Sequence, residues 1–368
     1  MIERTVMEKE NSIIPPTEAD FQGTQLDLFR FFLCSSEDER NQLSNTFDLW
    51  DSVPRYTVSR QQMDKIRKDK GFLDLYQVEF LYRGATLRTI IQAARILDEK
   101  TGKSKDYYPS ANEELIEDAL RKIAADQQNA FFDKSNFRSG VVFTLYMLRE
   151  ELKKRNHTRS YQEIVLSLHI LARSTIEIRA VGSSSKGGEG FAVSAYLSGL
   201  SAVSKNRFDD DPKAKWVVQF HPLVTQSIDA LTYRQFNYAQ MMSHRTQLAR
   251  WLHKQLSLKF TFASMITPFE MRYSTIKRDS ALLDGYGRER KAIETLDRAF
   301  DELKVAGVLM KIEKQVVLGV RGKIEDVIYA LFSSSDFSHH MKAANKRKQL
   351  AENRQSKTGR LSTALASR

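Results

Sequence analysis

Cysteine is almost absent from this chain of 368 residues, in which Cys34 stands alone. A single thiol cannot form a disulfide within the chain, and it cannot build a cysteine-rich zinc site. Such scarcity is typical of proteins of a reducing cytoplasm. The simplest interpretation of Cys34 is a small apolar side chain beside Phe31 and Leu33.

Long hydrophobic runs are also missing. Charged residues interrupt every apolar stretch, and none approaches the ~20 apolar residues that a membrane helix requires. The start, Met1-Ile-Glu-Arg4, is neither basic nor followed by an apolar stretch, so we expect no secretion signal. Hydrophobic residues make up 41% and charged residues 28% of the chain, which favours a largely globular protein. We therefore expect a cytoplasmic protein without a membrane partner.

Catalytic motifs are missing as well. Gly102-Lys-Ser104 resembles the end of a phosphate-binding loop, but Leu97 stands where that motif needs glycine. Gly285-Tyr-Gly287 precedes a predicted helix, but Arg290 replaces the third glycine of a dinucleotide fingerprint. A rolling-circle nicking enzyme needs two histidines flanking one residue, and no pair among the seven histidines has that spacing. The sequence therefore predicts a protein that is not an enzyme, without cofactor or metal.

What the sequence does have is unevenly distributed charge. The net charge is +11, yet residues 1–51 carry eleven acidic and four basic side chains. Residues 342–368 carry eight basic side chains and one acidic side chain. A basic body with a basic end favours a polyanionic partner, because neutralised phosphates release counterions. The alternative is a basic surface that only keeps the protein soluble.

The N-terminal segment predicts a disordered acidic arm over residues 1–50. It is polar around Pro15-Pro16 and shows no apolar period. One short apolar cluster interrupts it, between Leu26 and Leu33. Because a cluster this small cannot build a core, we expect it to dock on another protein.

The first half of the body shows the order helix, helix, helix, strand, loop, strand. Ser110 with Glu113, and Ser160 before the third helix, are helix N-terminal signals. Periodicity predicts strands over 74–82, 86–92, 174–181, 191–197 and 215–220, and helices from 110, over 143–154 and over 161–171. Three helices followed by a hairpin predict a winged helix, a variant of the helix-turn-helix.

The same order recurs in the second half. Periodicity predicts helices over 233–256, 267–275 and 288–304, and strands over 260–263, 308–318 and 325–332. The predicted fold is therefore helix-rich α+β, with tandem winged-helix domains. We expect a first winged-helix domain over 51–230, for DNA binding or dimerisation, and a second over 231–341, as the main DNA-binding domain. Residues 342–368 are expected to form a disordered basic tail.

The third helix of a winged helix enters the major groove, and its hairpin lies on the adjacent backbone or groove. Arginine can bind guanine through two hydrogen bonds, and lysine binds phosphate. The candidates in the second domain are Arg288, Arg290, Lys291, Thr295, Arg298, Lys311 and Arg321. Those in the first domain are Arg159, Tyr161, Gln162, Arg173 and Lys186. The alternative for each is a solvated charge, since five acidic residues share the helix over 288–304 and could pair within it.

Several segments resemble the iteron-binding replication initiators of bacterial plasmids, the Rep or RepA proteins. They are Tyr233-Arg-Gln-Phe-Asn-Tyr238, Gln247-Leu-Ala-Arg-Trp-Leu252, Arg290-Lys-Ala-Ile-Glu294, Leu303-Lys-Val-Ala-Gly-Val-Leu309 and Ser334-Ser-Asp-Phe-Ser338. The likeness covers roughly residues 50–348 and consists of patterns of apolar and basic positions. It implies binding to repeated double-stranded origin DNA, help in melting that DNA, and a monomer–dimer equilibrium linked to copy control.

The arm holds a sharper resemblance. Gln25-Leu-Asp-Leu-Phe29 is similar to the pentapeptide by which bacterial proteins dock on the replicative sliding clamp. The Gln25 amide suits a polar pocket rim, Asp27 is the central residue, and Leu26, Leu28 and Phe29 suit an apolar groove. The resemblance implies the sliding clamp as a partner, and the replicative helicase and host initiator as further ones. A winged-helix transcriptional repressor without a replication role is the alternative, and a nicking enzyme is the third hypothesis.

Overall fold

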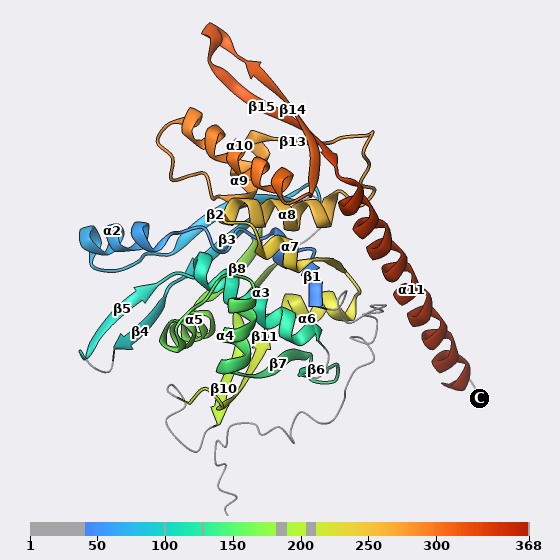
Figure 1. Ribbon diagram of the computed structural model, residues 1–368. Helices are drawn as coiled ribbons and strands as arrows, with labels where there is room; N and C mark the ends of the chain where they lie inside the picture. The colour runs from blue at the N-terminus through green and yellow to red at the C-terminus, as the bar shows by residue number, and fades with distance from the viewer. Residues whose placement is uncertain (1–40, 99–100, 127–128, 182–189, 204–210, 367–368) are drawn as a thin grey trace, which may run out of the picture.

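The computed structural model describes residues 41–98, 101–126, 129–181, 190–203 and 211–366 (Figure 1). Two hydrophobic cores organise these residues. The larger one runs from Phe47 to Met242, and the smaller one from Leu248 to Met341. The described chain therefore forms two domains, each built around a core of its own.

The first domain contains most of the described strands. Its helices are α2 (Arg60–Lys70), α3 (Ala111–Ala125), α4 (Leu145–Lys154), α5 (Tyr161–Arg173), α6 (Pro222–Asp229) and α7 (Tyr238–Met242). Its strands are β1 (Leu43–Phe47), β2 (Tyr76–Tyr82), β3 (Ala85–Gln92), β4 (Ala94–Asp98), β5 (Lys103–Tyr107), β6 (Ala130–Asp133), β7 (Arg138–Thr144), β8 (Thr175–Ala180), β9 (Phe191–Ala195), β10 (Leu197–Val203), β11 (Lys215–Phe220) and β12 (Tyr233–Asn237). Two four-stranded sheets, in the orders β2-β3-β8-β9 and β10-β11-β7-β6, surround its helices.

The winged-helix order predicted for this domain is confirmed. Helices α3, α4 and α5 are followed by the antiparallel hairpin β8–β9. Both predicted N-terminal signals are present, because the Glu113 carboxylate accepts the Ser110 backbone N–H at 2.9 Å and Glu163 accepts that of Ser160 at 2.8 Å. Strands β6 and β7 between α3 and α4 were not predicted.

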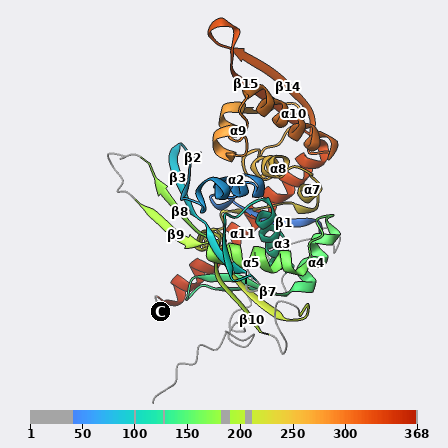
Figure 2. The ribbon, with the colours of Figure 1, turned by 90° about the vertical axis from the view of Figure 1, so that its left-hand side faces the viewer.

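The second domain is a compact winged helix. Its elements are α8 (Gln247–Lys259), β13 (Phe269–Arg272), α9 (Tyr273–Ser280), α10 (Glu289–Val305), β14 (Leu309–Leu318), β15 (Ile324–Ser333) and α11 (Ser335–Ala366). The sheet has the order β13-β15-β14, so the strand between the first two helices pairs with the returning strand of the hairpin. The hairpin β14–β15 projects beyond the domain in both views (Figures 1 and 2).

The helix predicted over 233–256 is wrong in its first half. Residues Tyr233–Asn237 form β12, which pairs antiparallel with β1. The chain then forms α7, capped by the Asn237 side chain, and α8, capped by Thr246. Helical periodicity could not reveal that residues 233–237 pair with β1, because the two strands are distant in sequence.

The boundaries of the predicted domains also need correction. Residues 41–50, assigned to the disordered arm, are folded, and β1 and Trp50 are buried in the first core. The second domain does not begin at residue 231, because Phe236, Tyr238 and Met242 pack into the first core. Its core begins at Leu248. The remaining arm, with its docking pentapeptide, lies outside the described residues.

Two local predictions in the second domain are wrong. Residues 260–263 form no strand, and the helix expected over 267–275 is instead β13 followed by α9. The reason is the hydrogen bonding of β13 to β15, which the capping signal at Thr267 does not reveal.

The C-terminal segment is not a disordered tail from residue 342. It is part of α11, whose first turns bury Phe337, Met341 and Ala344. The helix is anchored to β12 where Arg347 donates to the Gln235 side chain at 3.0 Å. Nowhere in the described chain is a helix both long enough and apolar enough to span a membrane.

Candidate nucleic-acid interface

Helix α10 presents one buried face and one basic face. Its buried face consists of Ala292, Ile293, Leu296, Ala299, Phe300 and Leu303. The spacing follows the helical repeat, so the remaining positions face solvent. The predicted residues Arg288, Arg290, Lys291 and Arg298 are all exposed, and Thr295 is half-buried. The structure therefore brings together the second-domain candidates that the sequence assigned to the third helix.

The acidic residues of α10 are mostly used inside the domain. Glu289 binds Lys277 at 2.6 Å and also accepts the Tyr273 hydroxyl, and these hydrogen bonds lower its pKa. Asp297 binds Lys314 at 2.6 Å and the Tyr329 hydroxyl at 2.8 Å. These carboxylates therefore do not neutralise the arginines of their own helix.

Glu302 is used in the same way. Its carboxylate accepts the backbone N–H groups of Arg245 and Thr246, at 2.8 and 3.1 Å, and so anchors the start of α8. Within the helix, an ion pair joins Arg290 to Glu294 at 3.3 Å. Among the described residues, no carboxylate pairs with Arg288, Lys291 or Arg298. These three cations are therefore available to an external anion.

The hairpin β14–β15 carries a second group of candidates. Lys311 pairs with Glu313 at 2.5 Å and lies over the Phe332 ring. Arg321 is exposed at the tip, in a left-handed conformation with φ of 63°. Beside it, Leu318 and Val320 are 62% and 85% exposed. Sequence patterning missed these apolar side chains, since alternation along a strand does not show that a hairpin leaves the body.

The candidate DNA-binding residues at helix α5 of the first domain differ in exposure and position. Gln162 is exposed near its start, and the ring of Tyr161 lies beneath the Arg149 guanidinium. Arg159 donates to Asn112 and to the Thr158 carbonyl, so part of its donor capacity is used within the domain. Arg173 is exposed at the other end of α5, roughly 18 Å along the helix axis from its start. Arg173 therefore does not join the others, and Lys186 lies outside the described residues.

A groove of about 1490 Å³ runs from the start of α5 to the segment that precedes α10. Residues at the start of α5 line one wall, including Arg159 and Glu163. Gly285 and Tyr286, just before α10, line another. The third wall is α2, which was not predicted, although Ser59 and Gln62 form a capping box that could have revealed it.

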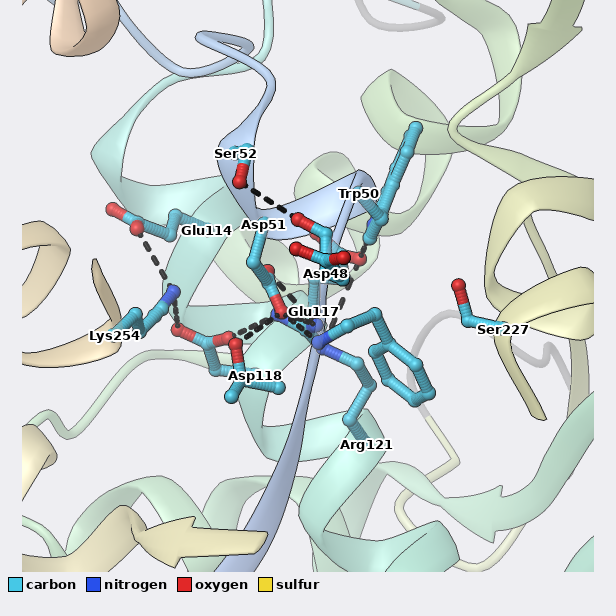
Figure 3. A network of polar contacts seen from close by, with 12 residues as sticks. Asp48, Trp50, Asp51, Ser52, Glu114, Glu117, Asp118, Arg121, Ser227 and Lys254 are labelled. Carbon is cyan, nitrogen blue, oxygen red and sulfur yellow. Dashed lines mark hydrogen bonds and ion pairs between the residues drawn. The ribbon is translucent and has the colours of Figure 1, made fainter. Parts of the chain in front are cut away.

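A buried network of charges joins the two domains (Figure 3). Asp51 accepts Arg121 at 2.8 Å and Arg55 at 3.0 Å, and Arg55 also contacts Glu117 at 3.1 Å. Burial alone would raise the pKa values of Asp51 and Glu117, but the guanidinium charges outweigh burial. The pKa of Asp51 is held well below its usual range and that of Glu117 is lowered to about 2.

Lys254 of α8 extends this network across the domain boundary. Its ammonium group lies 3.0 Å from Glu114 and 2.7 Å from Asp118, both on α3, and all three side chains are buried. Nearby, Gln255 donates to the Asp51 carbonyl at 2.9 Å, and Gln247 donates to the Tyr56 carbonyl at 2.8 Å. Because α8 and α3 are the first helices of the two winged helices, these contacts set the orientation of α5 relative to α10.

Two buried histidines predict a loss of stability in mild acid. Burial lowers the pKa of His221 to about 3 and that of His244 to about 4. An unfolded histidine titrates near 6.5, so below that pH the unfolded chain binds protons that the folded chain does not. We expect the free energy of unfolding to fall by about 1.4 kcal/mol per pH unit for each imidazole, until the folded pKa is reached.

Urea unfolding at about pH 7 and about pH 5.5 measures this slope. The variant His244→Gln should lose stability less steeply than the parent protein over the same interval. An identical slope in both proteins would assign the acid sensitivity to other groups.

Comparison with known proteins adds a likeness in structure. No protein-family model matches the sequence, and no curated protein sequence matches it. A structure of domains 2 and 3 of RctB has 9% sequence identity and a TM-score of 0.48, covering 77% of this chain and 97% of that one. A second structure of RctB domains 2–3 has 10% identity and a TM-score of 0.46, covering 81% and 99%.

The Pi initiator protein, solved in complex with iteron DNA, has 11% identity and a TM-score of 0.35, with coverage of 81% and 99%. Since the TM-scores lie below 0.5, the assignment of two winged helices rests on the element order of this chain itself.

Proposed function

We propose that this protein is a replication initiator that binds repeated sites in double-stranded plasmid origin DNA through both winged helices. One observation carries the proposal. Arg288, Lys291 and Arg298 form an exposed cationic face on α10 without internal carboxylate partners among the described residues. A helix of this kind enters the major groove in winged-helix proteins.

The placement of α5 supports binding by both domains. The start of α5 and the residues just before α10 line one continuous groove, so the two helices begin on the same side of the molecule. Figure 2, which views that side, has α5 below α2 and α10 above it. Two helices on one face suit successive major grooves, which lie about 34–36 Å apart along the duplex.

The replication role rests on the sequence resemblance to iteron-binding initiators. A hydroxyl-radical footprint of the purified protein on candidate origin DNA tests it. Protection repeating at intervals of about 10.5 bp or its multiples would support tandem sites. Uniform protection of the DNA that disappears at higher salt would indicate nonspecific binding and would overturn the proposal.

We further propose that the protein docks on the sliding clamp. Helicase recruitment and dimerisation would accompany its action at the origin. The change Leu28→Ala with Phe29→Ala is expected to abolish capture by immobilised clamp while origin binding is unchanged. The reason is that each such side chain stabilises a docked peptide by about 1.5–3 kcal/mol when buried. Undiminished capture would contradict docking.

The same variant separates the initiator from a repressor. A winged-helix repressor would give a similar footprint but would not sustain a plasmid that carries the repeats. Loss of plasmid maintenance in the docking variant, with repression of a reporter intact, would support initiation. Maintenance that needs no copy of this protein would favour the repressor.

A further inference from the structure

Helix α2 lies between the two recognition helices on the face described above. In Figure 2 it is in front of the first domain, with α9 and α10 above it and α5 below it. Its residues Arg60, Lys65, Asp69 and Lys70 line the groove that runs from the start of α5 to the segment before α10. Any duplex bound by both recognition helices must therefore pass α2.

Contacts with the first domain hold α2 firmly in this position. Ser59 and Gln62 cap its start, with hydrogen bonds of 2.8 and 3.2 Å, and Met63 is fully buried. Arg60 reaches Glu113 of α3 at 2.6 Å. Gly71 ends the helix with a φ of 83°, a left-handed conformation that suits glycine. A helix fixed at both ends presents its outer side chains without a large cost in ordering.

Lys65 and Lys68 are the outer cations of α2. Both are exposed, and within the described residues neither pairs with a carboxylate. The neighbouring Asp64 is already bound by Arg67 at 2.5 Å and by Lys105 at 3.2 Å, and these hydrogen bonds lower its pKa. The two lysines are therefore not neutralised by their own helix.

The opposite walls of the groove add cations. Arg159 at the start of α5 and Arg245 before α8 both line it. Six basic side chains line the groove against four carboxylates, of which Asp74 pairs with the groove residue Lys70 at 2.5 Å and Glu163 accepts the Ser160 N–H at 2.8 Å. Three elements thus direct positive charge into one groove, which favours a polyanion over an acidic or neutral peptide.

We propose that α2 is a third DNA-binding element, with Lys65 and Lys68 on phosphates of the backbone that crosses between the two major-groove contacts. The inference rests on the proposed function, because it presupposes a duplex held by α5 and α10. Successive major grooves on one face are about one helical turn apart, so a minor groove and its phosphates face the protein between them. The groove beside α2 is where that backbone passes.

The test uses a double variant of the full chain that carries both Lys65→Ala and Lys68→Ala. This variant and the parent protein are each titrated with origin DNA at several salt concentrations. We expect affinity to fall about 10-fold and the slope of log K against log salt to decrease by roughly 2, with unchanged preference among sequences. The matched control is Lys213→Ala with Lys304→Ala, two exposed lysines away from α2 that pair with no carboxylate among the described residues, which should change neither quantity. The conservative double variant Lys65→Arg with Lys68→Arg should keep the salt dependence of the parent protein.

The outcomes separate the two proposals. If the parent protein protects tandem sites but the α2 variant keeps its affinity and salt slope, α2 is not a DNA contact and only this inference fails. If the parent protein shows no site-specific protection, the proposed function itself fails. Ethylation interference supplies a second readout, because phosphates between the two major-groove contacts should interfere with the parent protein and not with the variant.

Discussion

Replacing Lys254 with methionine is expected to lower the free energy of unfolding by about 3–5 kcal/mol. The ammonium group is buried between Glu114 and Asp118, at 3.0 and 2.7 Å, and burial by itself lowers its pKa. The two carboxylates outweigh burial and keep the pKa of Lys254 above its ordinary value. Removing the cation leaves buried negative charge without its partner, which is the most costly way to break such a network. Urea unfolding followed by circular dichroism measures the loss.

A matched variant distinguishes lost charge pairing from lost packing. Adding Glu114→Gln to Lys254→Met removes the carboxylate charge that is left unpaired, while Asp118 keeps its ion pair with Arg121 at 2.5 Å, so much of the stability should return. If the single variant is as stable as the parent protein, the network does not join the domains energetically. The DNA-binding data add a functional readout, because a looser α8 would let α5 and α10 reorient and weaken simultaneous contact.

Removing the cationic face of α10 is the second large effect that we expect. Arg288→Ala, Lys291→Ala and Arg298→Ala together should lower affinity for origin DNA by about 100- to 1000-fold, since three contacts at about 1 kcal/mol each, the lower end of the usual range, sum to roughly 3–4 kcal/mol. The reason is the absence of carboxylate partners for these three residues in the described chain, while Glu289, Asp297 and Glu302 are bound elsewhere. Fluorescence anisotropy with labelled origin DNA measures the change.

The control lies on the same helix. Lys304 is exposed at the C-terminal end of α10, away from the N-terminal turn that faces the groove, and Lys304→Ala should change affinity little. The triple variant should unfold like the parent protein, because none of the three side chains is buried. Equal loss of affinity in the control and the triple variant would mean that general charge, not this helix face, binds the DNA.

Local sequence signals predicted the recognition helices well. The predicted inner face of α10, with Ile293, Leu296, Phe300 and Leu303, is buried. The start of α5 at Ser160 was predicted from its cap. Both predictions depended on residues within a few turns of each other, where helical spacing and capping chemistry act directly. The hairpins β8–β9 and β14–β15 were predicted for a similar reason, since the strands of each are neighbours in sequence.

The wrongly predicted elements concern partners distant in sequence. Residues 43–47 and 233–237 each gave a misleading local pattern, and they form one buried ladder only because the chain brings them together. The groove shared by α2, α5 and the segment before α10 arises from packing between elements that lie far apart in the sequence.

The sequence by itself determined which segments become recognition helices and which side chains those helices expose. Capping residues and apolar spacing act over a few residues, so a short stretch of sequence is enough to reveal them. Only the tertiary structure decided how the two winged helices face each other and which cations remain free. Those outcomes depend on buried contacts such as Lys254 with Asp118 and Arg121 with Asp51, where two charges separated along the chain are desolvated together.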